Sequence, residues 1–368
     1  MPKARLTVLQ VLPSLENGGV ERGTLEIAKG LIEQGHRALV ISAGGRMVDE
    51  LGAMGAEHFA WPIGKKSLFT LRWVRRLRRF LVEQKVDVLH ARSRMPAWIA
   101  WLAWRGMDAA TRPRFVTTVH GLYSVKRYSA IMTWGEQVIA VSNTAKQYIL
   151  DNYADVDEQR IRVIPRGVSN EQFPYQYHPG EQWMQAWHQE YPQLQGKKVL
   201  ILPGRLTRLK GHHDFIEMII RLRTQGEDVY GLIVGAEDPG RRSYAQELYD
   251  RVNKAGLQNV IVFTGNRTDI RDIYAVSDIV LSLSIKAESF GRTVLEPLNM
   301  GVPVVGYDHG GVGEILTEIF PQGKVPLSDR TLLTDKVKEI LINDVTVNAQ
   351  STFVLEKMVD ETIVLYQE

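Results

Sequence analysis

Two carboxylates and the residues between them form the part of the sequence with the clearest chemical potential. Glu288 and Glu296 lie eight positions apart, on either side of Phe290-Gly291. Apolar runs of strand length flank them, at 278–284 and 303–306. This order predicts strand, loop, helix and strand, with Glu288 on the loop and Glu296 in the opening turns of the helix. In a parallel sheet, both carboxylates would face the crevice above the carboxyl ends of the strands, where such sheets bind ligands.

The predicted helix start between these carboxylates would also attract negative charge. Its first N–H groups have no acceptor within the helix and favour an anion. Pro297 directly follows Glu296, and because proline disturbs a helix interior, we expect this helix to start late or to bend. Two solvated carboxylates around a helix are the alternative interpretation.

A second stretch could bring positive charge to the same ligand. Arg205 and Lys210 belong to a Gly-Arg-x-x-x-x-Lys-Gly pattern at 204–211, directly after the apolar run 198–202. An arginine binds phosphate oxygens with its planar fork, and a lysine adds a point charge. Two surface cations on a loop are the alternative.

The first half of the chain contributes a glycine pair and a histidine. Gly18 and Gly19 join a strand-like run at 6–12 to a segment of helical periodicity, and they would let a phosphate or sugar approach the backbone. A tight turn alone would also explain them, and the G-x-G-x-x-G pattern of dinucleotide binding is missing. His120-Gly121 directly follows the strand-like run 115–119. At the carboxyl end of a strand the imidazole could contact a ligand, or it could have only a structural role.

The elements that must position these residues alternate between strand and helix through both halves of the chain. A length of 368 residues favours two domains, and the polar, aromatic segment after Phe173 indicates a boundary near residue 170. We therefore expect an α/β protein with an N-terminal domain at 1–170, a C-terminal domain at 171–350 and a terminal helix at 351–368. The absence of cysteine excludes disulfides, cysteine–zinc sites and thiol nucleophiles. No apolar run approaches bilayer length and no signal peptide is evident, so we expect a cytoplasmic protein.

Other patterns allow simpler interpretations. The segment 65–83 combines Lys65 and Lys66 with five arginines among apolar residues, which suits either contact with an anionic membrane or the solvated face of a packed helix. No nucleic-acid-binding module accompanies it. Tryptophans at 98, 101 and 104 form a stripe that is typical of a core. Asp155-Val-Asp157 lies in a polar segment and is interpreted as a solvated loop, and adjacent His212 and His213 lack the spacing of a zinc site.

The Glu-x7-Glu motif and the Gly-Arg-x-x-x-x-Lys-Gly motif, in this order, resemble glycosyltransferase family 4, whose members are retaining enzymes of the GT-B fold. The resemblance covers nearly the whole chain. Around His90-Ala-Arg-Ser-Arg and His120-Gly-Leu-Tyr the sequence is similar to members that act on bacterial lipopolysaccharide core. The resemblance to the family implies two Rossmann-like domains that face each other across a cleft. The first domain would bind the acceptor and the second the nucleotide-sugar, and the terminal helix would pack on the first domain.

The resemblance also implies roles for individual residues. Glu288 would hold hydroxyls of the donor sugar, Glu296 the ribose, and His120 would lie near the anomeric centre. Arg205 and Lys210 would neutralise the leaving diphosphate, so that no metal and no cofactor are expected. The implied donor-binding residues are Gly18, Gly19, Gly204, Arg205, Lys210, Asn266, Arg267, Glu288, Phe290, Gly291, Arg292, Thr293, Val294 and Glu296. The implied acceptor-binding residues are Arg92, Arg94 and Tyr123.

These implications indicate a cytoplasmic hexosyltransferase-type enzyme of lipopolysaccharide core assembly, and the basic segment 65–83 would allow contact with the inner face of the cytoplasmic membrane. Other interpretations stay open at this point. A nucleotide-sugar epimerase or a phosphorolytic enzyme could have the same fold, and so could a non-catalytic sugar-binding subunit. The base and the sugar of the donor, the acceptor linkage and the oligomeric state stay open as well.

Overall fold

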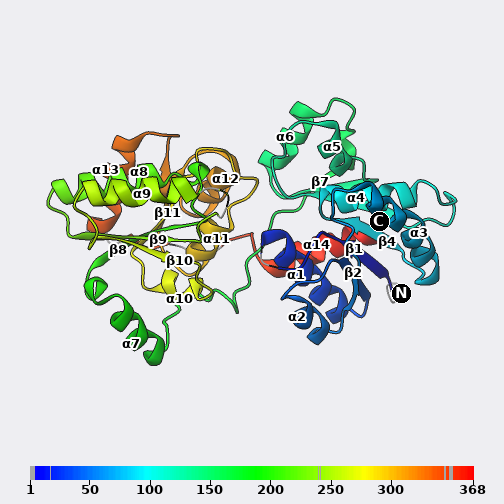
Figure 1. Cartoon of the computed structure of the whole chain (residues 1–368), viewed down its shortest axis with the longest axis horizontal. Helices are drawn as coiled ribbons and strands as arrows, with labels where there is room; N and C mark the ends of the chain where they lie inside the picture. Colours follow the sequence, from blue (N-terminus) through cyan, green and yellow to red (C-terminus); the bar gives the residue numbers. More distant parts are fainter. Residues whose placement is uncertain (1–4, 17, 239, 241, 344, 348–350) are drawn as a thin grey trace. The chain divides into compact units, whose positions relative to one another are not determined.

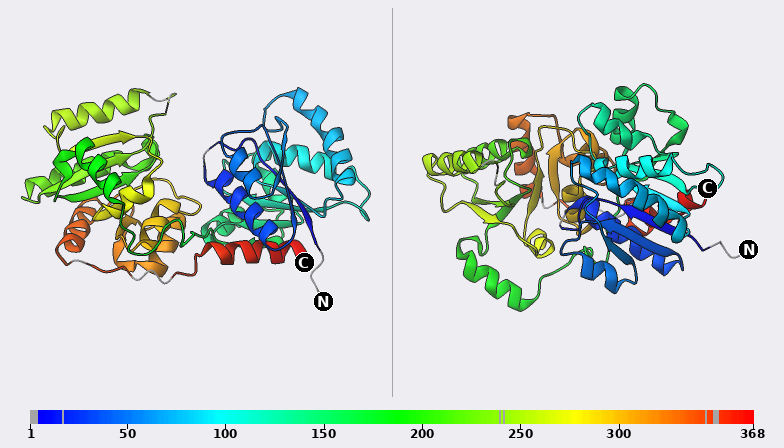
Figure 2. Two further views of the ribbon diagram at one scale, coloured as in Figure 1. Left: turned by 90° about the horizontal axis from the view of Figure 1, so that it is seen from below. Right: turned by 45° about the vertical axis from the view of Figure 1, so that its right-hand side comes forward.

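A computed structural model describes residues 5–16, 18–238, 240, 242–343, 345–347 and 351–368. The chain divides into two compact units (Figure 1). Unit 1 comprises Met1–Gly167 and Leu355–Glu368, and unit 2 comprises Val168–Val354. The final helix, red in Figure 2, therefore belongs with the first half of the chain.

Unit 1 is built on a seven-stranded sheet whose strands are all parallel, in the order β3-β2-β1-β4-β5-β6-β7. The strands are β1 (Thr7–Val11), β2 (Arg37–Ser42), β3 (Glu57–Ala60), β4 (Val88–Ala91), β5 (Arg114–Val119), β6 (Gln137–Ala140) and β7 (Ile161–Val163). The helices are α1 (Gly19–Glu33), α2 (Val48–Ala53), α3 (Arg72–Glu83), α4 (Arg94–Trp104), α5 (Arg127–Ala130), α6 (Asn143–Asn152) and α14 (Leu355–Gln367). Short 3₁₀ turns are η1 (Leu68–Leu71), η2 (Ile131–Thr133) and η3 (Glu158–Arg160).

The near-continuous apolar strands of unit 1 follow from burial on both faces, as parallel sheets require. Helices α1 and α14 pack together on one face, while α3 and α4 pack together on the other (Figure 1). The main core joins strand residues such as Val8 and Val116 to apolar side chains of α1 and α14, among them Leu31 and Ile363.

Unit 2 repeats this architecture with a six-stranded parallel sheet, in the order β10-β9-β8-β11-β12-β13. The strands are β8 (Lys198–Pro203), β9 (Val229–Val234), β10 (Ile261–Gly265), β11 (Ile279–Ser282), β12 (Val304–Tyr307) and β13 (Lys324–Val325). The helices are α7 (Glu181–Glu190), α8 (His212–Thr224), α9 (Arg242–Lys254), α10 (Ile270–Ala275), α11 (Arg292–Asn299), α12 (Gly310–Ile319) and α13 (Arg330–Asn343). The 3₁₀ turns are η4 (Pro192–Leu194), η5 (Arg208–Lys210) and η7 (Pro321–Gly323).

The predicted fold class is confirmed, because both sheets are parallel and lie among helices. In each sheet the strand order reverses beside the first strand of the unit, between β1 and β4 and between β8 and β11. Open parallel sheets bind ligands at the carboxyl ends of strands at such a reversal. Within the described ranges, no helix combines the length and apolar character needed to cross a bilayer.

Candidate functional site

The centre of the site in unit 2 is an ion pair at the strand reversal. Lys210 follows β8, Glu288 follows β11, and these strands are hydrogen-bonded neighbours. Lys210 Nζ donates to Glu288 Oε1 at 2.7 Å, and the Ser284 hydroxyl donates to the same oxygen. Burial tends to raise the pKa of Glu288, but the charge of Lys210 and the hydrogen bonds from Lys210 and Ser284 outweigh it and lower the pKa below its usual range. Glu288 is therefore a carboxylate that accepts hydrogen bonds.

Two glycines let Lys210 reach this position. Gly204 has φ +140°, and the aliphatic stem of Lys210 lies where a side chain would extend, with two of its carbons 3.3 Å from an ideal Cβ. Gly211 is left-handed at φ +74°, and a Cβ there would lie 2.0 Å from the carbonyl oxygen of Leu283. Since only glycine tolerates both the conformation and this approach, the Gly-Arg-x-x-x-x-Lys-Gly pattern is explained by the geometry of the loop.

The loop that carries Glu288 is held by the start of α12. Gly311 N–H donates to the carbonyl of Glu288 at 2.8 Å, and His309 Nε2 contacts the carbonyl of Ser284 at 2.6 Å. An added Cβ would come within 2.7 Å of the Glu288 carbonyl oxygen at Gly310 and within 2.3 Å of the Phe290 carbonyl oxygen at Gly311. Ser284 and His309 were not among the predicted site residues. Their sequence signal was a polar residue at the carboxyl end of each neighbouring strand.

Glu296 has a different environment from Glu288. It lies in the second turn of α11, where Arg292 Nε donates to its Oε1 at 2.9 Å and the Tyr274 hydroxyl lies 3.5 Å from its Oε2. Its placement in the opening turns of a helix is confirmed. The expectation of a late helix start was wrong: α11 begins at Arg292, directly after Gly291 at φ +144°, and contains Pro297. It ends at Asn299, so proline removes one hydrogen bond from a short helix.

The residues between the two glutamates divide into buried and accessible groups. Phe290 is buried and meets Phe353 edge to face, with 5.7 Å between the ring centroids. Val294 is also buried, whereas Thr293 is partly exposed at the first turn of α11. The Val294 N–H donates to the carbonyl of Gly291 at 2.9 Å. The N–H groups before it have no acceptor within the helix, so this segment offers backbone donors rather than the Phe290 ring.

The other predicted donor-binding residues of unit 2 differ in their availability. Arg205 is exposed and makes no hydrogen bond or ion pair within the described part of the chain. Asn266 is exposed on the loop after β10. Arg267, in contrast, is paired with Asp269 at 2.8 Å and with Glu190 at 2.9 Å, and its guanidinium lies 5.7 Å from the ring centre of Trp187. Arg267 thus attaches α7 to the sheet edge.

Unit 1 gathers its predicted residues at the carboxyl ends of its strands. His120 follows β5, and Arg166, which was not predicted as a site residue, follows β7 and donates to His120 Nδ1. Gly18 and Gly19 open α1, which follows β1. Arg92 follows β4 but is only 1% exposed, and its Nη1 donates to Gln10 Oε1 at 2.9 Å. Its side chain therefore lies in the interior rather than on an accessible acceptor surface.

The two other predicted acceptor residues, Arg94 and Tyr123, form a stacked group at the same end of the sheet. The Arg94 guanidinium lies 4.7 Å from the ring centre of Tyr123 and 5.4 Å from that of Tyr128. Lys66 Nζ lies 5.4 Å from the Tyr128 ring. Arg94 forms no ion pair with a carboxylate among the described residues, so a preorganised cation with aromatic neighbours is available here.

Several simpler interpretations are confirmed. Asp155 and Asp157 are exposed, and Asp157 caps η3. Of the tryptophan stripe, the core interpretation holds for Trp104, which is buried, whereas Trp98 and Trp101 are partly exposed and pack with Trp134. The adjacent-histidine pattern did not indicate a carboxylate partner, but His213 Nε2 lies 2.9 Å from Glu247 Oε1.

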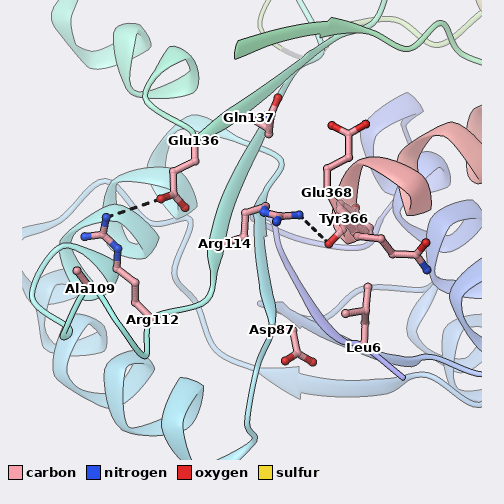
Figure 3. Close-up of a pocket in the computed structure, with 10 residues that line it drawn as sticks. Leu6, Asp87, Ala109, Arg112, Arg114, Glu136, Gln137, Tyr366 and Glu368 are labelled. Atoms are coloured by element: carbon pink, nitrogen blue, oxygen red, sulfur yellow. Dashed lines mark hydrogen bonds and ion pairs between the residues drawn. The ribbon is translucent and has the colours of Figure 1, made fainter. Parts of the chain in front are cut away.

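A pocket of about 650 Å³ opens at the opposite end of the unit 1 strands from His120 (Figure 3). It is lined by residues at the amino ends of strands, including Leu6, Asp87 and Arg114. Arg114 donates to the last carbonyls of α14, at 3.2 Å for Leu365 and 2.9 Å for Tyr366. Its role is to hold the end of that helix, so we assign the pocket no part in the chemistry.

Comparisons with known proteins match both units. Residues 17–172 match the family model Glycosyltransferase Family 4, and residues 184–352 match Glycosyl transferases group 1. The crystal structure of a glycosyltransferase from Rickettsia africae ESF-5 is 31% identical at a TM-score of 0.85, over 99% of this chain and 98% of that chain. Anabaena Alr3699/HepE in complex with UDP-glucose is 20% identical at a TM-score of 0.76, over 99% and 96% of the two chains. The lipopolysaccharide core biosynthesis mannosyltransferase LpsB of Rhizobium meliloti (strain 1021) is 35% identical over 121 residues, which are 33% of this chain and 34% of LpsB.

Proposed function

The chain belongs to glycosyltransferase family 4 and has the GT-B fold, and from this premise we propose that it moves a hexose from a nucleotide-sugar to a glycan or glycolipid acceptor with retention at the anomeric carbon. The observation that carries the proposal is the Lys210–Glu288 pair at the strand reversal of unit 2. This pair supports the proposal because a carboxylate can bind sugar hydroxyls and an adjacent cation can bind the departing diphosphate.

The charges of unit 2 suit a leaving nucleoside diphosphate. A lysine ammonium has three donors, and Lys210 uses one of them for Glu288, so two remain for phosphate oxygens. Arg205 is exposed and can bind further oxygens, and the first turn of α11 adds N–H groups. We propose that these groups stabilise the developing negative charge without a divalent metal. Glu288 holds sugar hydroxyls and Glu296 the ribose.

The proposed reaction balances without a protein nucleophile. The acceptor hydroxyl oxygen forms a bond to the anomeric carbon on the face from which the diphosphate oxygen departs. The acceptor proton passes to that departing phosphate oxygen, and the bond between carbon and phosphate oxygen breaks. His120 contributes a hydrogen bond to the donor. Arg94 and Tyr123 hold the acceptor, and the similarity to LpsB supports an acceptor of the lipopolysaccharide core.

Binding of the donor is tested most simply by thermal unfolding with UDP-, GDP- and ADP-sugars. We expect a UDP-hexose to raise the melting temperature by several degrees, because a ligand at about 100 times its Kd adds about 2.7 kcal/mol to the stability of the folded state. The likeness to a structure that binds UDP-glucose favours uridine. If none of the three donors raised the melting temperature, the proposed binding of a nucleotide-sugar would be contradicted. A transferase would release UDP only when an acceptor is present, whereas an epimerase would act on the nucleotide-sugar without any acceptor, so the two can be told apart by measuring UDP release with and without acceptor.

Contact with an anionic membrane is proposed for the segment 65–83, through η1 and the polar face of α3. Four apolar residues of α3, among them Trp73 and Leu77, are buried, so this helix cannot insert its main apolar face. Val82 in its last turn is 64% exposed. Leu68 and Phe69 in η1 are instead 85% and 81% exposed. Residues 61–135 hold 15 Lys and Arg against three Asp and Glu, while the whole chain has a net charge of +3. Two exposed apolar side chains within this basic segment suit lipid better than an acidic protein.

We expect the double substitution Leu68→Ser and Phe69→Ser to reduce co-sedimentation with phosphatidylglycerol vesicles about tenfold or more, since each buried apolar side chain contributes about 1.5 kcal/mol or more. Ile342→Ser is the matched control, because Ile342 is 66% exposed in unit 2 and should leave binding unchanged. Equal binding of wild type to phosphatidylcholine and phosphatidylglycerol, or an unchanged double variant, would contradict the proposed contact.

A further inference from the structure

The imidazole of His120 has a side-chain partner that sets its chemical state. Arg166 lies 46 residues further along the chain, after β7, and its Nη2 donates to His120 Nδ1. A guanidinium has donors only. His120 Nδ1 must therefore act as an acceptor in this contact, which leaves the ring proton on Nε2.

The surroundings of His120 favour the same state. Burial lowers the pKa of His120 well below its ordinary value, and the charges of Arg166 and Arg92, with a smaller effect of His90, act in the same direction. The Tyr123 hydroxyl is hydrogen bonded to the backbone of His120. The acidic groups nearby, Glu26 and Glu21, act on Arg92. The imidazole is therefore uncharged at neutral pH, with the Arg166 guanidinium at its Nδ1.

The position of Arg166 is fixed by the packing of two helices. An added Cβ at Gly23 of α1 would lie 2.3 Å from Arg166 Nη1 and 3.0 Å from Arg92 Nη2. On the α14 side, Met358 Sδ lies 3.9 Å from Arg166 Nη1. Gly23 is buried, so its missing side chain provides the space through which Arg166 reaches His120. Arg166 is itself only 9% exposed.

We propose that Arg166 is a positioning residue that holds His120 with Nδ1 as acceptor and Nε2 as donor. His120 then presents a fixed N–H to an oxygen of the donor sugar or its diphosphate. This last step rests on the proposed function, whereas the tautomer does not. Without Arg166, the ring proton can move to Nδ1, and Nε2 would then repel the oxygen that it should bind.

The tautomer can be measured directly by long-range ¹H–¹⁵N NMR of the full chain labelled at histidine, with the His120 signals assigned by their loss in His120→Gln. We expect wild type to show a single Nε2–H tautomer that does not titrate between pH 8 and about pH 6. Arg166→Met should show a mixture of tautomers and a titration midpoint above that of wild type, because one of the nearby cations is removed while burial remains. Arg166→Lys should keep part of the wild-type state. Gly23→Ala, which displaces Arg166 without removing its charge, should also mix the tautomers.

Kinetics provide the second readout. We expect Arg166→Met to lower kcat about 100-fold at pH 8, the effect of losing one positioned donor, with the thermal shift by UDP retained. This deficit should shrink as the pH falls through the titration midpoint of His120 in the variant, because an imidazolium carries protons on both nitrogens. A purely structural defect would not recover on acidification.

An unchanged His120 tautomer and titration in both Arg166→Met and Gly23→Ala would overturn the inference, as would a wild-type Nδ1–H tautomer. If Arg166→Met does not fold, Gly23→Ala and Arg166→Lys decide by the same spectra. If the spectra agree with expectation while wild type binds no nucleotide-sugar, the proposed function fails and the positioning role of Arg166 stands.

Discussion

Replacing Glu288 with glutamine is expected to lower the rate of sugar transfer by about 100-fold or more. The substitution keeps the shape of the side chain but removes its negative charge. That charge is stabilised by a hydrogen bond from Lys210 at 2.7 Å and by a short hydrogen bond from the Ser284 hydroxyl. Glutamine would also leave Lys210 without its counter-charge in a partly buried position, where the two side chains are 29% and 25% exposed. Initial rates of nucleoside diphosphate release with a verified donor and acceptor provide the measurement.

Lys210→Ala should have an effect of similar size on transfer, because it removes the cation that we assign to the departing diphosphate. The two losses should not add in the double variant, since contacting residues are coupled. Arg208→Ala is the matched control. Arg208 lies two residues before Lys210 and pairs with Glu247 on the surface, so its loss should change the rate by no more than about twofold. Near-wild-type rates of both site variants, with intact thermal unfolding, would contradict the assignment of the site.

Gly311→Ala is expected to destabilise unit 2 and to abolish most of the activity, although alanine is normally the better residue within a helix. The added Cβ would lie 2.3 Å from the carbonyl oxygen and 2.4 Å from the Cα of Phe290. These are backbone atoms, so either α12 or the loop that carries Glu288 must move. We expect a loss of about 2–4 kcal/mol in unfolding free energy and a fall in the transfer rate of at least about tenfold.

Gly52→Ala is the control for this substitution. Gly52 lies within α2, and nothing lies within 4 Å of an added Cβ, so alanine should stabilise the protein by about 0.4–1 kcal/mol. Urea unfolding monitored by tryptophan fluorescence measures both variants. A Gly311→Ala protein with wild-type stability and rate would show that the close approach of α12 to the Glu288 loop is unimportant.

Much of the fold could be predicted from local patterns. Apolar runs of strand length alternated with segments of helical periodicity, and this order alone favoured parallel sheets. The Gly-Arg-x-x-x-x-Lys-Gly and Glu-x7-Glu patterns were recognisable because each is contained in one loop and its adjoining helix. The state of single residues was less predictable. Arg92 and Arg94 are separated by one residue, yet Arg92 is buried beside Gln10 and Arg94 stacks on tyrosines.

The basic helix shows why composition was ambiguous there. Its amphipathic pattern agreed with both a membrane surface and a packed helix. The structure shows four apolar residues of α3 in the core, and Arg78 donates to the carbonyl of Ala103 at the end of α4. The two most exposed apolar side chains of the segment, those of Leu68 and Phe69, belong to η1, which precedes the helix.

The sequence by itself determined the alternating elements, the glycine-bounded loops and the residue types that could bind a sugar diphosphate, because these depend on neighbours along the chain. Only the tertiary structure decided which charges meet. Lys210 and Glu288 are 78 residues apart, and Arg166 and His120 are 46 residues apart. Such contacts depend on which strands lie side by side and on where a missing side chain, as at Gly23 or Gly311, lets two segments approach. That outcome is set by packing over the whole unit, and no local pattern encodes it.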